Sequence, residues 1–521
     1  MAPILLAVDK IYTRALVWFR YDLRVHDNAA LARALRECRE VVCVFIFERT
    51  PPADGVHGSD GVDAPQTDRR LEFQRESLLQ LDAQLRALGG GLMVRHAIAA
   101  QEIPALARAL AVQAVYVNRE GDPRVHEASQ RLFGRLAADG VLLHTCKDRV
   151  IFEHDEVLTS EGAGFTAFAA YRRAWLARLA QNPTALAAHP VEREAAALTP
   201  PPPGFDQPPP ALAELGLQPS NLCDLPLPPG VQGGAAMFGN FLARIDRYLA
   251  MRDHPALRGP SYLSVHLRWG TLSVRQLVRA VHPLALQGHA GAKAWLGELI
   301  RREFFFQLPA HHPQLAQGKS FHSAFDRIIW HHGKHADALY AAWCEGRTGY
   351  PLVDAAMAQL RVSGYMHPRL RNLAASFLCK CLGLDWRRGE AYFAQTLNDA
   401  EFALNNGNWQ RIASCGCDAP PWWRSPDPVE QSRRIDPEGK FICRYLPQLA
   451  RLSAEAIHAP WQATPAVLEA AGIRIGADYP APIVNHISEA QRTLARYAIV
   501  KNAVEHGTSR GKRGRKRGSG V

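Results

Sequence analysis

The second half of the chain combines aromatic, charged and amide side chains within segments of helical spacing. Most of the chain's eleven tryptophans lie there, among Arg, Asn and Asp residues at positions where a purely structural bundle would prefer aliphatic side chains. Trp295, Glu298 and Arg302 have the spacing i, i+3 and i+7, which places them on one face of a helix. This composition predicts a cavity that binds a ligand through stacking and polar contacts.

Thiols and imidazoles give no comparable sign of a metal site. Ten cysteines are scattered along the chain, and two Cys-x-Cys pairs, at 379/381 and 415/417, do not make the dense framework of a small secreted domain. His311-His312 and the run from His331 to His335 lack a Cys or carboxylate at metal-ligand spacing. We therefore expect reduced structural cysteines, surface histidines and no metal.

The charge of the chain favours an anionic partner. Lys and Arg number 61 against 50 Asp and Glu, which gives a net charge of +11 and a pI near 9.3. Residues 501–521 hold seven basic residues against one Glu, and the Gly-interleaved run from Arg510 to Gly518 cannot build a core. We expect a disordered tail that contacts a phosphate backbone, with a merely solubilising tail as the alternative.

Length and hydropathy indicate a globular protein. The 521 residues, 47% apolar and 21% charged, suffice for about two or three domains. No uninterrupted apolar stretch reaches membrane-spanning length, and Met1 to Asp9 shows neither a basic n-region nor a cleavage pattern. A cytoplasmic location is the expectation.

Apolar runs and helical segments alternate along the first part of the chain. Strands are predicted at 15–19, at 41–47, from 92, at 114–117 and at 141–144, with helices at 29–38 and 71–88 among the segments between them. Repeated β-α units of this kind predict a doubly wound parallel sheet. The turn from Arg20 to Arg24 lacks the glycines of a nicotinamide-binding loop, which excludes that class.

The rest of the chain predicts a linker and an all-α domain. Eleven prolines between Thr199 and Gly230 interrupt regular structure and indicate a long surface connection. Helical spacing follows at 240–251, 273–282, 292–307, 351–361, 369–382 and 388–396. The predicted organisation is an α/β domain at 13–147, an interdomain connection at 148–231, a helical domain at 232–500 and a basic tail at 501–521.

Four ordered motifs carry a family resemblance. They are Val17-Trp-Phe-Arg-Tyr-Asp-Leu-Arg-Val-His-Asp-Asn28, Gly259-Pro-Ser-Tyr-Leu-Ser264, Gly349-Tyr-Pro-Leu-Val-Asp-Ala-Ala356 and Asn405-Asn-Gly-Asn-Trp-Gln410. Together they closely resemble the photolyase/cryptochrome flavoprotein family, in particular bacterial class I cyclobutane pyrimidine dimer photolyases, over residues 15–452. The resemblance implies an antenna-type α/β domain and a helical domain that holds U-shaped FAD in a cavity opening on a basic DNA groove.

The resemblance also assigns FAD contacts residue by residue. Serine hydroxyls and a helix N-terminus match the adenosine-diphosphate contacts, where they can hold phosphate oxygens. Arg371 and Asp399 match an ion pair beside the isoalloxazine ring, and Asn405 matches the residue that faces flavin N5 and tunes its reduced states. The expected FAD contacts are Tyr248, Ser261, Tyr262, Leu263, Ser264, Trp295, Glu298, Arg302, Arg371, Asp399, Ala400, Glu401 and Asn405.

Three tryptophans match the family's electron-transfer chain from the surface to photoexcited flavin. They are Trp409, Trp386 and Trp330, although the loop from Trp330 to Trp343 is longer than is usual in the family. With Glu298 and Asn405, these tryptophans form the expected catalytic set. Buried core tryptophans would be the alternative interpretation.

The lesion-contacting surface departs from the family pattern. Two tryptophans of the dimer pocket are replaced by Arg301 and Arg411, an Asn by Pro368 and a Met by Asn372. Glu298, which faces the dimer in photolyases, is kept, as are two residues that match phosphate contacts. The expected DNA contacts are Arg301, Arg302, Pro368, Arg369, Asn372, Arg411 and Arg424.

Other chromophores and lesions of the family are not expected. Folate-binding relatives use a Glu and a Cys-Lys pair where this chain has Asp122, Ala316 and Gln317, so a deazaflavin or no antenna is more consistent with the sequence. Animal (6-4) photoproduct enzymes place a catalytic His where this chain has Pro368. The spacings of Cys344, Cys379, Cys381, Cys415, Cys417 and Cys443 match class I motifs, which argues against an iron-sulphur cluster.

Three functions are compatible with these residues. The first is light-driven repair of pyrimidine dimers in double-stranded DNA by a monomer in the bacterial cytosol, with FAD as electron donor. The second is a cryptochrome-like photoreceptor or regulator that keeps flavin and tryptophans without repair. The third is a DNA-binding flavoprotein in which FAD is structural. Light-dependent repair separates the first two, and a light-dependent flavin redox change separates them from the third.

Overall fold

The computed structural model describes residues 10–49, 67–122, 126–419, 427–498 and 500, excluding the side chains of 126–129. Contacts divide the chain into two compact units. Unit 1 comprises residues 1–158, 172–246 and 261–303, and unit 2 comprises 159–171, 247–260 and 304–521. The units cut across the predicted domains, because several helices from the second half of the chain group with the sheet. The predicted domain bounds stay a prediction.

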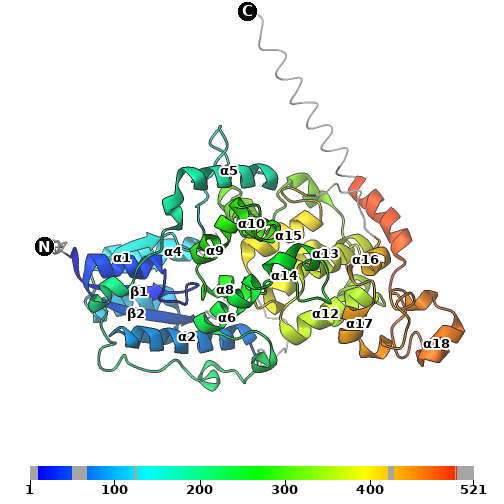
Figure 1. Cartoon of the computed structure of the whole chain (residues 1–521), viewed down its shortest axis with the longest axis horizontal. Helices are drawn as coiled ribbons and strands as arrows, with labels where there is room; N and C mark the ends of the chain where they lie inside the picture. The colour runs from blue at the N-terminus through cyan, green and yellow to red at the C-terminus, as the bar shows by residue number, and fades with distance from the viewer. Residues whose placement is uncertain (1–9, 50–66, 123–125, 420–426, 499, 501–521) are drawn as a thin grey trace, which may run out of the picture. The chain divides into compact units, whose positions relative to one another are not determined.

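Unit 1 contains a five-stranded parallel sheet, drawn in blue to cyan in Figure 1. Its strands are β1 Tyr12–Phe19, β2 Cys38–Glu48, β3 Leu92–Ala97, β4 Ala114–Asn118 and β5 Leu142–Cys146, in the order β3-β2-β1-β4-β5. Val17 lies opposite Cys43 on β2 and Tyr116 on β4. The order reverses direction at β1, as in doubly wound folds, and confirms the predicted fold class.

Helices cover both faces of this sheet. Helices α1 Ala29–Glu37 and α2 Arg69–Ala87 share one core with Val17 and Cys43. Helices α3 Ala99–Ala109 and α4 His126–Ala138 share the other core with Leu16 and Val42. Because both faces are buried, β1 and β2 consist of nearly continuous apolar runs rather than alternating ones.

The proline-rich segment forms short turns that are tied to unit 1. It includes η4 Leu212–Leu215 and η5 Leu222–Asp224, with η3 Glu192–Ala197 just before it, and no α-helix or sheet strand up to Pro229. The Thr199 amide donates to the Val41 carbonyl at 2.9 Å, and the Ser220 amide donates to Glu72 at 2.8 Å. Prolines prevent regular elements here as predicted, and these contacts order the segment.

The remaining helices of unit 1 carry part of the expected site. They are α6 Gly230–Leu242, α8 Ser264–Trp269, α9 Val274–Leu286 and the first part of α10 Ala290–His311. Helix α5 Phe168–Gln181 is divided between the two units, with η2 Pro183–Leu186 after it. The α9 helix begins at a Ser273 cap, whose side chain accepts from the Gln276 amide.

Unit 2 is helical, which confirms the predicted all-α second half. Its helices include α7 Tyr248–Met251, α11 Lys334–Glu345, α12 Pro351–Ser363, α13 Pro368–Ser376, α14 Trp386–Thr396, α15 Phe402–Ile412, α16 Pro428–Ile435, α17 Lys440–Tyr445 and α18 Pro465–Ala471, together with the last part of α10. Shorter turns are η6 Ile245–Arg247, at the boundary with unit 1, η7 Pro313–Gln317, η8 Ser323–Arg327, η10 Pro447–Leu449 and η11 Pro460–Gln462. A π-helical turn, η9 Phe377–Cys381, follows α13. The core packs around fully buried Trp343, Leu360 and Leu378.

All ten cysteines are free thiols, and seven of them are buried, each with a raised pKa. Cys223 is exposed, while Cys344 and Cys443 are half-buried. No helix among the described residues is both long and apolar enough to cross a membrane. Nor does any group of three or more His, Cys, Asp or Glu in the described chain form a metal-binding arrangement.

Candidate functional site

The Ser261 to Ser264 segment of unit 1 forms an uncapped helix start. Tyr262 has a φ of 59°, a left-handed conformation that is uncommon for a tyrosine and is found at ligand-binding turns. Helix α8 begins at Ser264, and its N-cap residue, Leu263, makes no side-chain cap hydrogen bond. The first amides of α8 and two half-buried serine hydroxyls therefore suit the phosphate oxygens of a dinucleotide.

Helix α10 carries the next expected group on one face. Trp295 is buried against Phe241, with ring centroids 4.8 Å apart, and stacks on Phe238 at 5.9 Å. One turn later, Glu298 lies 3.6 Å from Arg301, and each keeps about a third of its side chain exposed. The Glu298 carboxylate expected to face a lesion is thus paired with the arginine that replaces a tryptophan.

Arg302 and Glu303 tie α10 to the segment after β5. Arg302 is 8% exposed and donates to the Arg149 carbonyl at 2.6 Å, which suits a cavity wall better than a contact with DNA phosphate. Glu303 accepts hydrogen bonds from the Ile151 amide at 2.5 Å and the Trp175 indole at 2.6 Å. Burial raises the pKa of Glu303 to about 7.

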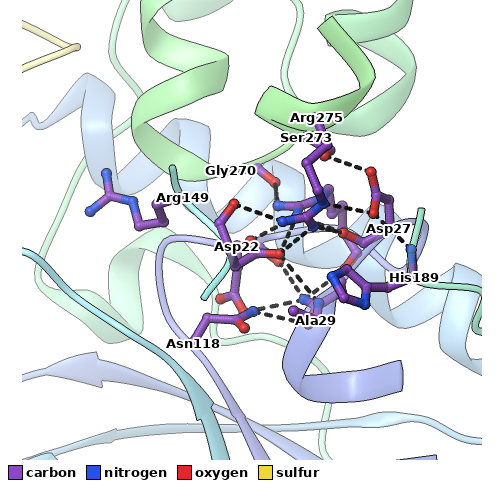
Figure 2. A network of polar contacts seen from close by, with 12 residues as sticks. Asp22, Asp27, Ala29, Asn118, Arg149, His189, Gly270, Ser273 and Arg275 are labelled. Carbon is purple, nitrogen blue, oxygen red and sulfur yellow. Dashed lines mark hydrogen bonds and ion pairs between the residues drawn. The ribbon is translucent and has the colours of Figure 1, made fainter. Parts of the chain in front are cut away.

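The first sequence motif forms a buried ion network in unit 1 (Figure 2). Arg24 donates to both Asp148 oxygens at 2.7 Å, and Arg275 bridges Asp148 at 2.8 Å and Asp27 at 3.0 Å. Arg24 also donates to the Gly270 carbonyl at 3.0 Å. The network connects the loop after β1 to α9, so this motif positions elements of unit 1 and holds no reactive group of its own.

Hydrogen bonds saturate the carboxylates of this network. Asp27 accepts from the Ser273 hydroxyl at 2.7 Å and the His189 amide at 2.9 Å. Burial alone would raise the pKa of Asp148, but Arg24 and Arg275 outweigh it and lower the pKa to about 2. Burial and the nearby Asp148 charge raise the pKa of Asp22, whose carboxylate accepts from Asn118 at 2.6 Å.

In unit 2, Arg371 and Asp399 form the expected ion pair. An Arg371 terminal nitrogen donates to the two Asp399 oxygens at 2.9 and 3.1 Å, and its Nε donates to the Met366 carbonyl at 2.8 Å. Asp399 keeps 5% of its side chain exposed and Arg371 keeps 27%. Ala400 and buried Glu401 lead directly into α15. The pair can therefore be reached by a ligand from the arginine side.

Helix α15 presents Asn405 in a defined orientation. Its amide nitrogen donates to the Glu390 carbonyl of α14 at 2.8 Å, and the neighbouring Asn406 donates to the Glu390 carboxylate at 3.0 Å. The amide oxygen of Asn405 is the atom that this arrangement leaves for a ligand. A neutral amide oxygen is a suitable hydrogen-bond acceptor for an N–H group such as that of a reduced flavin.

The three expected electron-transfer tryptophans all lie in unit 2, with different surroundings. Trp409 is buried on α15 and packs edge-on against Phe393 at 5.0 Å and Trp343 at 6.2 Å. Trp386 is buried at the start of α14, with the Arg387 guanidinium 4.5 Å from its ring centroid. Half-buried Trp330 packs against Tyr497 at 6.2 Å.

The expected DNA contacts of unit 2 lie on α13 and α15. Pro368 is the exposed first residue of α13, Asn372 lies one turn later, and half-buried Arg411 lies near the end of α15. Arg369 donates to Asp253 at 2.7 Å, with both side chains nearly half exposed. Arg424 and the basic tail lie outside the described residues.

The remaining expected residues fall outside these groups. Tyr248 is buried on α7, with the Arg252 guanidinium 5.1 Å from its ring centroid. Asp122 follows β4 in unit 1, whereas Ala316 and Gln317 lie in η7 of unit 2.

Several residues of the site were missed by the sequence patterns. Glu390 holds Asn405, and Gly389 lies against the Trp409 ring, yet neither belongs to the four motifs. A glycine inside a helical pattern was a usable signal of close packing. The partners of the first motif, Asp148 and Arg275, lie far along the chain and had no local signal.

Each unit, taken by itself, offers donor groups that fit one part of FAD. Unit 1 offers an uncapped helix start with two serines, and unit 2 offers an accessible arginine, its aspartate and an oriented amide. Each of these groups matches one chemical part of the cofactor, the pyrophosphate or the polar edge of the flavin ring.

Comparisons with known proteins agree with these features. Residues 15–192 match the family profile described as DNA photolyase, and residues 295–499 match the FAD binding domain of DNA photolyase. The deoxyribodipyrimidine photo-lyase of Vibrio cholerae is 36% identical over 93% of this chain and 99% of its own length.

Solved structures are similar over nearly the whole chain. A bacterial class III photolyase from Agrobacterium tumefaciens superposes with a TM-score of 0.82 at 30% identity, covering 96% of this chain and all of its own. A cryptochrome of Synechocystis superposes with a TM-score of 0.79 at 25% identity, covering 94% of this chain and all of its own.

Proposed function

Because the chain belongs to the DNA photolyase family and carries its FAD-binding domain, we propose that it splits cyclobutane pyrimidine dimers in UV-damaged double-stranded DNA, using light. The observation that carries this proposal is the Arg371–Asp399 pair with oriented Asn405 in the matched FAD-binding domain. We further propose that it acts as a monomer in the cytosol.

FAD, when bound, supplies an electron under blue or near-ultraviolet light and receives it back after the dimer has split. Ser261 and Ser264 would hold its phosphates with the first amides of α8, and Trp295 would form part of the cavity wall. Arg371 would place positive charge beside the flavin ring, with Asp399 fixing the guanidinium. Asn405 would accept a hydrogen bond at N5 through its amide oxygen.

Tryptophans would restore the reduced cofactor after it has been oxidised. We propose that Trp409 is the donor nearest the flavin, followed by Trp386 and Trp330. Burial of Trp409 and Trp386 keeps water away from the inner members, whereas half-buried Trp330 can exchange an electron with an external reductant.

DNA would be held mainly by charge. Arg369 and Arg424 would contact phosphates, and the basic tail would add a sequence-independent attraction that weakens with salt. Stacking on an aromatic side chain contributes about 1 to 3 kcal/mol per base, so the loss of two tryptophans weakens dimer selectivity. Planar Arg301 and Arg411 can return part of that binding by stacking and by hydrogen bonding.

A photoreceptor is the second candidate, and the Glu298–Arg301 pair favours it. In this pair the lesion-facing carboxylate lies 3.6 Å from a guanidinium, which competes with a lesion for the same oxygen atoms. The similarity to a cryptochrome structure is compatible with this candidate.

Repair of a thymine-dimer oligonucleotide by the fully reduced protein, in light and in darkness, tests the proposal. Light-dependent repair that is lost in Glu298→Ala supports a photolyase. No repair by the wild type, together with repair by the Arg301→Trp/Arg411→Trp double variant, would identify the photoreceptor instead. A protein that takes up no FAD would contradict both candidates.

The tryptophan chain has a separate test. Trp409→Phe is expected to abolish blue-light reduction of oxidised flavin in the presence of an external reductant. Repair by chemically reduced Trp409→Phe is expected to continue, because the flavin then needs no electron from the chain. Unchanged photoreduction would remove Trp409 from the mechanism.

A further inference from the structure

Gly389 of α14 lies directly against the indole of Trp409. A Cβ atom built on Gly389 would lie 2.6 Å from Cζ3 and 2.7 Å from Cζ2 of that ring, and closer still to Cη2. Ordinary van der Waals contact for a Cβ begins near 3.4 Å. Any side chain at position 389 therefore requires the Trp409 ring and α14 to move relative to each other.

Two buried rings pack on the Trp409 indole. Phe393, one turn after Gly389 on α14, packs on it edge-on at 5.0 Å, and Trp343 of α11 packs on it at 6.2 Å. Both neighbours are themselves buried, and the Trp343 indole nitrogen donates to the Ala374 carbonyl at 3.1 Å. Close-packed rings of this kind cannot absorb a methyl group without a shift.

The backbone at Gly389 does not need a glycine. Gly389 lies in the interior of α14 and is absent from the positive-φ glycines of the chain. Alanine is a better helix former than glycine at such a position. Space for the indole is thus the remaining physical requirement for glycine here.

Gly389 also lies between two groups of the electron-transfer site. Trp386 precedes it by one helical turn on α14, and the next carbonyl along, that of Glu390, holds the Asn405 amide. Asn405 and Trp409 are four residues apart on α15, and so on one face of that helix. A shift of the indole against α14 therefore changes its position relative to both groups.

We propose that Gly389 is a positioning residue that seats the Trp409 indole for electron transfer to the flavin. This inference rests on the proposed function. Because electron transfer weakens steeply with distance, a displaced indole slows photoreduction while the flavin contacts of Arg371, Asp399 and Asn405 stay in place. Repair by already reduced flavin does not use Trp409 as a donor and is unaffected.

Gly389→Ala tests whether Gly389 positions the Trp409 indole, and Gly239→Ala is the matched control. Gly239 lies in α6, where a built Cβ meets no atom within 4 Å. We expect Gly389→Ala to keep bound FAD and repair by the chemically reduced protein, and to photoreduce several-fold more slowly than wild type. Gly239→Ala is expected to match wild type throughout. Wild-type photoreduction in Gly389→Ala would overturn the proposal.

A double-mutant cycle in thermal stability tests the contact itself, even in a protein that does not photoreduce. Gly389→Ala is expected to lower the melting temperature in the wild-type background and to lower it much less in Trp409→Phe, whose smaller ring leaves room for a methyl group. An equal decrease in both backgrounds would show that the indole does not require Gly389. Absence of photoreduction in the wild type, with the coupling intact, would instead contradict the tryptophan chain of the proposed function.

Discussion

The ion network after β1 and the Arg371–Asp399 pair both join arginines to aspartates, but they differ in how fully each charge is engaged. In the network, the Arg24, Arg275, Asp27 and Asp148 side chains are at most 4% exposed and carry several mutual contacts. In the pair, Arg371 keeps 27% of its side chain exposed. Buried charges that contact one another stabilise the fold, whereas a charge with remaining exposure can also bind a ligand. A clear match to a family motif therefore does not show whether its charged residues stabilise the fold or bind a ligand.

Removal of a network carboxylate should have the largest effect on stability. Asp148→Ala leaves Arg24 and Arg275 buried with one fewer anion, and breaking a buried ion pair costs about 3 to 5 kcal/mol. Urea denaturation monitored by circular dichroism measures this loss. A decrease in the free energy of unfolding of less than about 1 kcal/mol would show that the network stabilises the fold no more than an exposed ion pair does.

Removal of the ligand-side carboxylate should affect the cofactor more than the fold. Asp399→Ala is expected to cost about 1 to 3 kcal/mol, the scale of a lost charged hydrogen bond, because Arg371 can still reach water. FAD retention after gel filtration should fall sharply, since the guanidinium is no longer fixed. Full retention of FAD would contradict the role of the pair.

Acid should weaken the network in a defined pH range. The pKa of Asp148 is lowered from 3.8 to about 2, so its contribution is complete above pH 3.8 and is lost as the pH falls towards 2. The shift corresponds to roughly 2 kcal/mol. Asp22, whose pKa is raised, acts in the opposite direction. The test is to measure the free energy of unfolding against pH in wild type and in Asp148→Asn. The same decrease at acid pH in both proteins would contradict the prediction.

The smallest effect is expected at the exposed Arg369–Asp253 pair. Asp253→Asn should change stability by less than about 1 kcal/mol, because both side chains are nearly half exposed. DNA affinity should rise slightly, since Arg369 no longer has a competing carboxylate. Fluorescence anisotropy with an undamaged duplex at two salt concentrations measures this, and weaker binding would argue against a phosphate contact by Arg369.

The sheet could be predicted from the sequence, but some helices could not. Buried strands such as β1 and β2 are short apolar runs between turns, a local signal. Helix α15 contains three Asn and one Gly, which are poor helix formers, and tertiary contacts stabilise it. One such contact is Gly407, where a built Cβ would meet the Phe305 ring.

The candidate site was predictable where motifs matched and not where distant partners complete it. Arg371, Asp399 and Asn405 followed from the family resemblance, and the structure pairs the first two as expected. The carbonyl that orients Asn405, and the rings that enclose Trp409, belong to α11 and α14 outside the motifs. Such partners depend on helix packing, which no local spacing encodes.

The burial of most of the free thiols affects how readily the protein is oxidised under illumination. A flavoprotein exposed to light can generate oxidants, and the thiolate is the form of cysteine that they attack. Burial raises the pKa of Cys381, Cys415 and Cys417 to about 12, which keeps these thiols protonated and unreactive. Cys223, in η5, is instead exposed to solvent. Oxidative damage under illumination should therefore begin at Cys223, on the surface of unit 1.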